Sequence, residues 1–174
     1  MSQALKDCLD PWKAADRQLL LQPQVAIASL PRLAELLIET DGEVEAKLEF
    51  ARGQERMAML SGHVRATLVL RCQRCLKPMA FPVDHDFEIV FVHSPEQAAS
   101  VPEQYDAYEV EQEQVCIEDI IEDELLLSLP QVAMHAEDEC MIQTEFGEGP
   151  VVEEQPEKEN PFAVLAALKS DKDD

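Results

Sequence analysis

The stretch HVRATLVLRCQRC, residues 63–75, decides the fold that this sequence predicts. Every second residue from Val64 to Leu70 is apolar, whereas the residues between them are mostly polar. A period of two is typical of a β-strand that buries one face. The strand stops at Cys72 and Cys75, so two thiols stand at a strand end. Such a pair is typical of half a zinc site or of a redox pair.

Segments on both sides of this stretch predict further strands of the same sheet. Residues 43–50 alternate in the same way, residues 52–54 turn the chain, and residues 57–60 lead through Ser61-Gly62 into the strand before Cys72. Residues 86–92 are rich in β-branched and aromatic side chains, which favour strands. The pattern predicts an α+β fold with an antiparallel β-sheet of at least four strands, a meander that is open or barrel-like, and a few short helices.

Two segments have the spacing of amphipathic helices. Residues 29–38 combine an early proline with leucines on one side. In residues 117–129 apolar positions recur at helical spacing, the other face carries carboxylates, and Pro130 ends the helix. Residues 94–114 are acidic and interrupted by prolines without a sustained period, which predicts a long loop or a partly ordered insertion.

The composition changes towards the end of the chain. We expect one α+β domain over residues 1–144, a flexible acidic linker over 145–159, and a short helix with a tail over 160–174. The last helix begins at Asn160-Pro161 and carries an apolar side made of Phe162, Leu165 and Leu168. A helix of about ten residues is marginal alone, so it docks on its own domain or on a partner.

The charge is distributed unevenly along the chain. Residues 1–85 contain eleven acidic and eleven basic side chains, whereas residues 86–174 carry 25 carboxylates against three lysines, which accounts for the whole net charge of −22. Such a field repels free nucleic acid and attracts basic partners over a Debye length of about 8 Å. The alternative is that these carboxylates form a solvated face and linkers that keep the protein soluble.

The sequence predicts a cytoplasmic location. The first 18 residues carry charges without an apolar stretch of signal-peptide length, and no run of about twenty apolar residues occurs. The cysteine count is odd, and in this compartment thiols stay reduced, which argues against a disulfide framework. Cys8 and Cys116 are therefore interpreted as buried or incidental thiols.

Four side chains of metal-ligand type suggest one structural zinc site: Cys72, Cys75, His135 and Cys140. The alternative is a thiol oxidoreductase using Cys72 and Cys75, because neighbouring arginines favour the thiolate. Such enzymes usually place the pair at a helix N-terminus, whereas here the chain continues towards another strand.

Two surfaces are candidates for binding. Cations that could contact the phosphates of an RNA are grouped near the cysteine pair: Arg65, Arg71, Arg74 and Lys77. An ordinary strand surface is the alternative interpretation of this group. Carboxylates of the acidic helix and the apolar side of the last helix could hold a basic protein: Glu118, Glu122, Asp123, Phe162, Leu165 and Leu168.

Several of these motifs together resemble the YceD family, the large ribosomal RNA subunit accumulation proteins. The resemblance spans nearly the whole chain and lies in four segments: CQRCL at 72–76, EDELLLSLP at 122–130, residues 135–140 and NPFAVL at 160–165. In many relatives the third segment resembles a second cysteine pair, whereas this chain has His135 and Cys140 there.

The resemblance implies a function but names no chemical mechanism. It implies a non-enzymatic factor needed for normal accumulation of 23S rRNA and for assembly of the large ribosomal subunit. Expected partners are 23S rRNA or a large-subunit precursor and a basic large-subunit ribosomal protein, with neither a membrane nor a small-molecule substrate. A general acidic chaperone without a ribosomal role is the remaining alternative.

Overall fold

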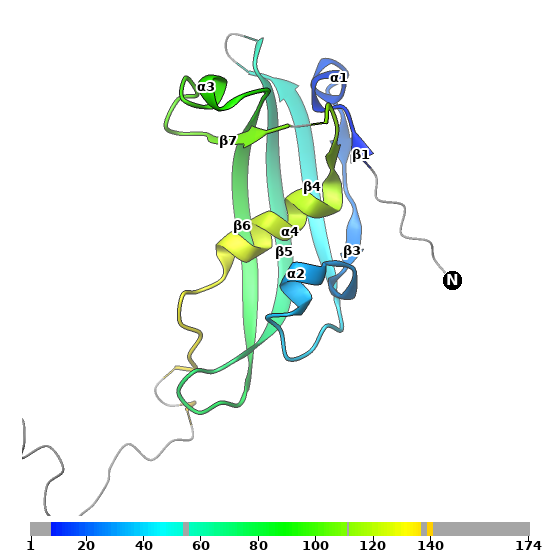
Figure 1. Ribbon diagram of the computed structural model, residues 1–174. Helices are drawn as coiled ribbons and strands as arrows, with labels where there is room; N and C mark the ends of the chain where they lie inside the picture. Colours follow the sequence, from blue (N-terminus) through cyan, green and yellow to red (C-terminus); the bar gives the residue numbers. More distant parts are fainter. Residues whose placement is uncertain (1–7, 54–55, 111, 137–138, 141–174) are drawn as a thin grey trace, which may run out of the picture. The chain divides into compact units, whose positions relative to one another are not determined.

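Two long antiparallel strands form the centre of the sheet, as Figure 1 shows. In the computed structural model, β5 (Ala58–Arg71) and β6 (Pro78–Val92) pair from Ala58 opposite Phe91 to Arg71 opposite Pro78. The structure describes residues 8–53, 56–110, 112–136 and 139–140, which lie in one compact unit within residues 1–141.

Shorter strands complete the sheet on both sides of this hairpin. On one side β4 (Glu43–Arg52) pairs with β5, and β4 in turn pairs with β2 (Leu20–Leu21) and β3 (Gln24–Ala26). On the other side β7 (Asp106–Glu109) runs parallel to β6. A separate two-stranded ladder joins β1 (Cys8–Leu9) to β8 (Val115–Cys116).

The helices are short, apart from one that crosses the sheet. They are α1 (Pro11–Asp16), α2 (Pro31–Ala34), α3 (Pro95–Ala98) and α4 (Ile117–Ser128), with a 3₁₀ turn, η1 (Ile27–Ser29), before α2. In Figure 1, α4 runs obliquely over one face of the strands. Ile120, Ile121 and Leu125 of α4 are fully buried there with the even-numbered residues of β4 and β5. Burial of this face stabilises the fold.

The predicted fold class is confirmed, and the described sheet is open. Its strand order is β2-β4-β5-β6-β7, and within the described residues the two outer strands do not pair to close a barrel. The predicted strands at 43–50 and 86–92 are present, although β6 already begins at Pro78. Among the described helices, none is both long and apolar enough to cross a membrane.

Three local features differ from what the sequence pattern suggested. Residues 57–60 and the strand before Cys72 form one continuous strand, because β5 runs through Ser61-Gly62. The predicted helix at 29–38 shrinks to η1 and one turn of α2, since the following backbone pairs with β5: the Ile38 N–H donates to the Val69 carbonyl at 2.8 Å. Residues 94–114 are not a continuous loop but contain α3 and β7, because the second half of the segment pairs with β6.

The expectation for Cys8 and Cys116 is also wrong. The register of β1 with β8 places the two cysteines directly opposite each other, and they form a disulfide. Cys8 is exposed and Cys116 half-buried, so neither is a buried spectator. The remaining cysteines within the described residues, Cys72, Cys75 and Cys140, are free thiols.

Candidate metal centre and neighbouring surfaces

The four residues proposed as zinc ligands converge at one end of the β5–β6 hairpin. One potential ligand atom from each of Cys72, Cys75, His135 and Cys140 lies within 4.8 Å of every other. Cys72 directly follows β5, and Cys75 lies in the tight turn that leads into β6. The Cys72 N–H donates to the Lys77 carbonyl at 2.9 Å, which closes the turn.

The other two ligands arrive on the segment that follows α4. Pro130 comes just after α4, as the sequence predicted, and the chain then returns to the hairpin end. The Gln73 N–H donates to the Ala133 carbonyl at 2.8 Å, so the segment is fastened to the cysteine turn by its backbone. This contact brings His135 and Cys140 beside the cysteine pair.

The ligand distances fit a single tetrahedral ion. The sulfurs of Cys72 and Cys140 are 4.0 Å apart, and Cys75 Sγ lies 3.3 Å from His135 Nδ1. Tetrahedral zinc with ordinary zinc–sulfur and zinc–nitrogen bonds separates its ligand atoms by roughly 3.5–3.8 Å. Three thiolates and one imidazole are also a donor set that zinc prefers. The cluster can therefore bind a metal with only small side-chain adjustments.

Surrounding groups orient these ligands. His135 Nε2 lies 3.1 Å from the Pro78 carbonyl, which only accepts, so Nε2 carries the proton and Nδ1 keeps its lone pair for a metal. Arg74 donates from Nε to Cys140 Sγ at 3.0 Å and from an η-nitrogen to the His135 carbonyl at 3.2 Å. In a metal-bound site its charge would offset part of the negative charge of the ligand thiolates.

The sulfurs differ in their acidity. Burial by itself raises the pKa of Cys72, but backbone N–H groups of Cys75, His135 and Arg74 outweigh it and lower that pKa to about 5. At Cys75 the Lys77 N–H lowers the pKa, but burial and the neighbouring sulfurs of Cys72 and Cys140 together raise it. The site thus contains a stabilised thiolate in a crowded group of sulfurs, which is the environment a metal cation would neutralise.

The same geometry argues against dithiol redox chemistry. The cysteine pair lies in a hairpin turn and not at a helix N-terminus, and Cys72 is fully buried. Thiol exchange needs an accessible attacking sulfur.

The four predicted RNA-binding cations do not form one surface. Arg65 lies in the middle of β5 and forms an ion pair with Asp84 at 2.9 Å, whereas Arg74 points at Cys140. Arg71 and Lys77 are exposed on either side of the cysteine turn. Three of the four cations, Arg71, Arg74 and Lys77, therefore lie at the hairpin end. Arg65 lies roughly 20 Å from Arg71 along the strand.

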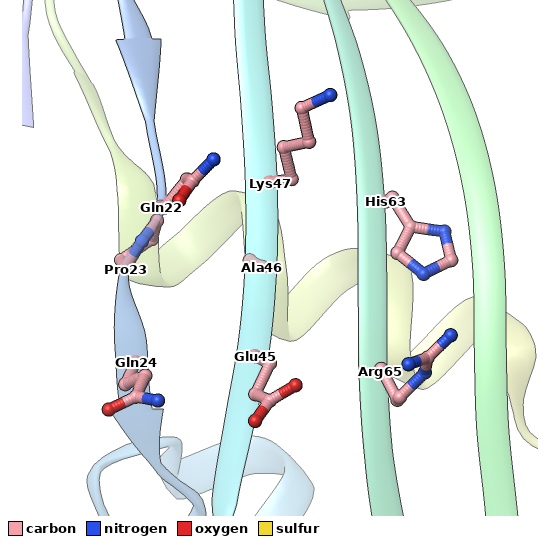
Figure 2. A pocket seen from close by; sticks show the side chains of 8 residues that line it. All are labelled: Gln22, Pro23, Gln24, Glu45, Ala46, Lys47, His63 and Arg65. Atoms are coloured by element: carbon pink, nitrogen blue, oxygen red, sulfur yellow. The ribbon is translucent and has the colours of Figure 1, made fainter.

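Arg65 belongs to a mixed-charge hollow on the sheet face opposite α4. Figure 2 shows it beside Glu45, His63 and Lys47, whose side chains project to the same side. The hollow measures about 480 Å³. His63 Nδ1 lies 2.8 Å from Asp86 of the neighbouring strand β6. Glu45 lies among Lys47 and Arg65, and Asp84 of β6 pairs with Arg65, so these four charges balance and leave no positive excess for phosphate.

The carboxylates of the acidic helix are less available than the sequence predicted. Glu122 is 2% exposed, and it accepts bonds from the backbone N–H groups of Arg32 and Leu33 and from Arg32 Nε. Asp123 also pairs with Arg32, at 2.6 Å. The expectation that Glu122 is exposed is wrong, while Glu118 is half-buried. Phe162, Leu165 and Leu168 lie outside the described residues.

Sequence reasoning missed Arg32 because its carboxylate partners are about ninety positions away in the chain. It also missed β7, although the alternation of Tyr108 and Val110 with more polar neighbours is a short strand signal.

Fold and site together define a small α+β protein with a candidate metal centre at one end of its sheet. The family model described as "Large ribosomal RNA subunit accumulation protein YceD" matches residues 60–169. A Haemophilus influenzae protein of that name is 34% identical over 165 residues, which cover 92% of this chain and 94% of the relative. This chain therefore belongs to the YceD family, as its motifs suggested. No solved structure matches it significantly.

Proposed function

We propose that this chain supports the accumulation of large-subunit ribosomal RNA as a non-enzymatic cytoplasmic factor that binds 23S rRNA in large-subunit precursors. The relative that spans nearly the whole chain is named for accumulation of large ribosomal RNA, and this likeness carries the proposal. The surface proposed for this contact is the hairpin end, where the candidate metal centre lies and where Arg71 and Lys77 are exposed.

Zinc is the metal we propose for this centre, held by Cys72, Cys75, His135 and Cys140. The ion would supply a structural cross-link between the hairpin end and the segment after α4. Arg74 then has a positioning role, because it bonds both a ligand sulfur and the backbone of the second segment.

The RNA contact would use the hairpin end and not the middle of the sheet. Arg71 is exposed and borders an apolar hollow of about 510 Å³ whose lining includes Leu36 and Leu76. These leucines are 55% and 64% exposed. Cations beside exposed apolar side chains suit unpaired RNA, because phosphates meet the cations and base faces meet the apolar groups. Lys77 extends the same edge.

Sedimentation of cell lysate tests the function. The tagged full chain should migrate with large-subunit precursors in a sucrose gradient. Loss of the protein should lower 23S rRNA relative to 16S rRNA. A chain that stays at the top of the gradient, together with an unchanged rRNA ratio, would favour the acidic-chaperone interpretation instead.

A matched pair of substitutions tests the RNA contact. Arg71→Gln should reduce the slope of log affinity against log salt by about 0.7–0.9 on 23S rRNA fragments, since one phosphate contact is lost. Arg65→Gln removes the same side chain from the same strand, but that arginine is paired with Asp84 and should leave the slope unchanged. Equal slopes for both variants and the wild type would exclude this contact.

A second partner, a basic large-subunit ribosomal protein, is favoured by the 25 carboxylates in residues 86–174. Because Glu122 and Asp123 are engaged by Arg32, such a partner would need a different contact from the one that the sequence predicted.

A further inference from the structure

Within the described residues, an apolar groove lies uncovered between α4 and the edge strand β7. It measures about 460 Å³, and its lining is mostly apolar: Ile89, Ala107, Tyr108, Leu126 and Leu127, with Asp106, Asp123 and Glu124 as its carboxylates. Leu127 is 77% exposed, the highest value among the exposed large apolar side chains within the described residues. Tyr108 is half-buried and packs edge-on against Phe91 with ring centroids 5.9 Å apart. The groove thus has an aromatic group held by the core and an exposed leucine on its helix side.

The groove lies beside a strand that can accept another strand. Among the described strands β7 is the last of the sheet, so its outer backbone edge has no strand partner. Ile89 opposes Asp106 and Phe91 opposes Tyr108, which places Asp106 and Tyr108 on the face that α4 covers. A polypeptide added beside β7 would direct every second side chain to that face, towards Leu127.

The charge around the groove has one sign. None of the eight lining residues is basic. Arg32 engages Asp123 and His85 lies 3.3 Å from Glu124, whereas Asp106 is exposed and forms no ion pair with the described residues. Apolar walls below uncompensated carboxylate charge are complementary to a segment that carries both cations and large apolar side chains.

We propose that this groove binds an extended basic segment of a partner protein, which adds a strand to β7 and places alternate apolar side chains between Tyr108 and Leu127. Arginine or lysine at other positions on the same face of the segment meets Asp106, which lies on that face of β7. The inference rests on the proposed function only for the identity of the partner, a basic ribosomal protein, because groove binding itself is measurable without ribosomes.

Three labelled peptides of equal length serve as probes for the full chain. The first, the arginine–leucine peptide, repeats leucine-serine-arginine-serine, so that leucine and arginine fall on the same face of a strand. The second, the arginine–serine peptide, has serine in place of every leucine, and the third has glutamate in place of every arginine. Fluorescence anisotropy at about 0.15 M salt limits attraction by net charge alone. We expect the arginine–leucine peptide to bind at least about tenfold more tightly than either other peptide, since burial of one leucine is sufficient for that factor.

A pair of double variants locates the binding site. Leu127→Ser with Asp106→Asn removes an exposed leucine and an exposed carboxylate from the groove. The control, Leu20→Ser with Glu49→Gln, removes the same two kinds of group from the opposite side of the sheet, where Leu20 is 50% exposed and pairs with Glu49. All four side chains are exposed, so both variants should unfold at the same temperature as the wild type.

The groove variant should bind the arginine–leucine peptide about tenfold or more weakly than the wild type does. The affinity of the control variant should stay within about twofold of the wild-type affinity. Equal losses in both variants, or equal affinity for the arginine–serine peptide, would show that binding follows net charge and would overturn the proposal. Absence of peptide binding to the wild type would overturn it as well. If the peptide binds as expected but the chain does not sediment with large-subunit precursors, the proposed ribosomal function is wrong, and the groove remains supported as a binding site for basic segments.

Discussion

Glu122 is a buried carboxylate that connects two helices. Its oxygens accept from the Arg32 and Leu33 backbone N–H groups at 2.7 and 3.1 Å and from Arg32 Nε at 2.8 Å. The side chain therefore satisfies the free N–H groups at the start of α2 while it anchors α4. This role explains why a carboxylate is retained on the packed side of α4.

Replacement of Glu122 by alanine should lower the free energy of unfolding by about 2–3 kcal/mol, since two backbone donors lose their acceptor. The loss should stay below the ~3–5 kcal/mol of a fully buried ion pair, because the Arg32 side chain is 53% exposed and can be hydrated. Glu118→Ala on the same helix is the control and should change stability by about 0.5 kcal/mol or less. Urea unfolding measures both, and similar losses would contradict the structural role of Glu122.

Glu124 predicts a pH dependence of stability. Burial raises its pKa above the ordinary 4.5, although the hydrogen bond from His85 acts in the opposite direction. A raised folded-state pKa means that the stability contributed by this group is full below 4.5 and is lost as pH rises through the folded value. Asp106 and Asp123 also face this carboxyl and raise its pKa further.

The free energy of unfolding of Glu124→Gln, measured relative to that of the wild type, should therefore rise as the pH is raised from about 5 to about 7.5. The lower limit stays above the isoelectric point of about 4.3, where the chain carries little net charge. Urea unfolding at both pH values gives the difference, and a His85→Gln background removes the titration of the histidine. A difference that stays constant, or that shrinks as pH rises, would contradict the raised pKa.

At the scale of elements, Gly62 allows β5 to run without a break. It lies on the core face opposite Phe87, and a Cβ at this position would overlap the phenyl ring. Gly62→Ala should cost about 1–3 kcal/mol through overpacking, although the same change in an open strand would be stabilising. Ser61→Ala, on the other face of the strand, should change the free energy of unfolding by less than about 0.5 kcal/mol. Denaturant unfolding compares them, and a stabilising Gly62→Ala would refute this packing.

The disulfide fastens the β1–β8 ladder across 108 positions of the chain. Cys8→Ser should lower stability by about 2–4 kcal/mol in an oxidised preparation, because a long loop in the unfolded chain is no longer closed. In reduced preparations the variant and the wild type should unfold alike. Thermal and urea unfolding under both conditions decide this, and equal stability in the oxidised state would show that the two thiols remain unpaired.

The elements that depend on local pattern were predictable from the sequence, and those that depend on distant partners were not. Alternation revealed β4 and most of β5, and the apolar spacing revealed α4. The ligand types of the metal cluster were recognisable from the Cys72–Cys75 spacing and the later histidine and cysteine. In contrast, β7 depends on pairing with β6, the disulfide depends on the β1–β8 register, and burial of Glu122 depends on Arg32. None of these partners is near in sequence.

At the scale of the whole described unit, the two proposed contacts lie at opposite ends of β6. The metal cluster adjoins Pro78 at one end, and the groove includes Ile89 near the other. Eleven residues of extended strand separate these positions by roughly 35 Å. An RNA at the hairpin end and a protein segment beside β7 would therefore not compete for the same surface, which suits a factor that holds both during assembly.

The metal centre is the central claim, because it fastens the hairpin end on which the proposed RNA contact depends. Native mass spectrometry of the intact chain, purified without chelator, tests it most directly. We expect one zinc ion per chain in the wild type and in Cys8→Ser, and none in Cys75→Ser or His135→Ala. A wild-type mass equal to the bare polypeptide, with the half-buried Cys75 and Cys140 reacting freely with a thiol reagent under native conditions, would contradict the account.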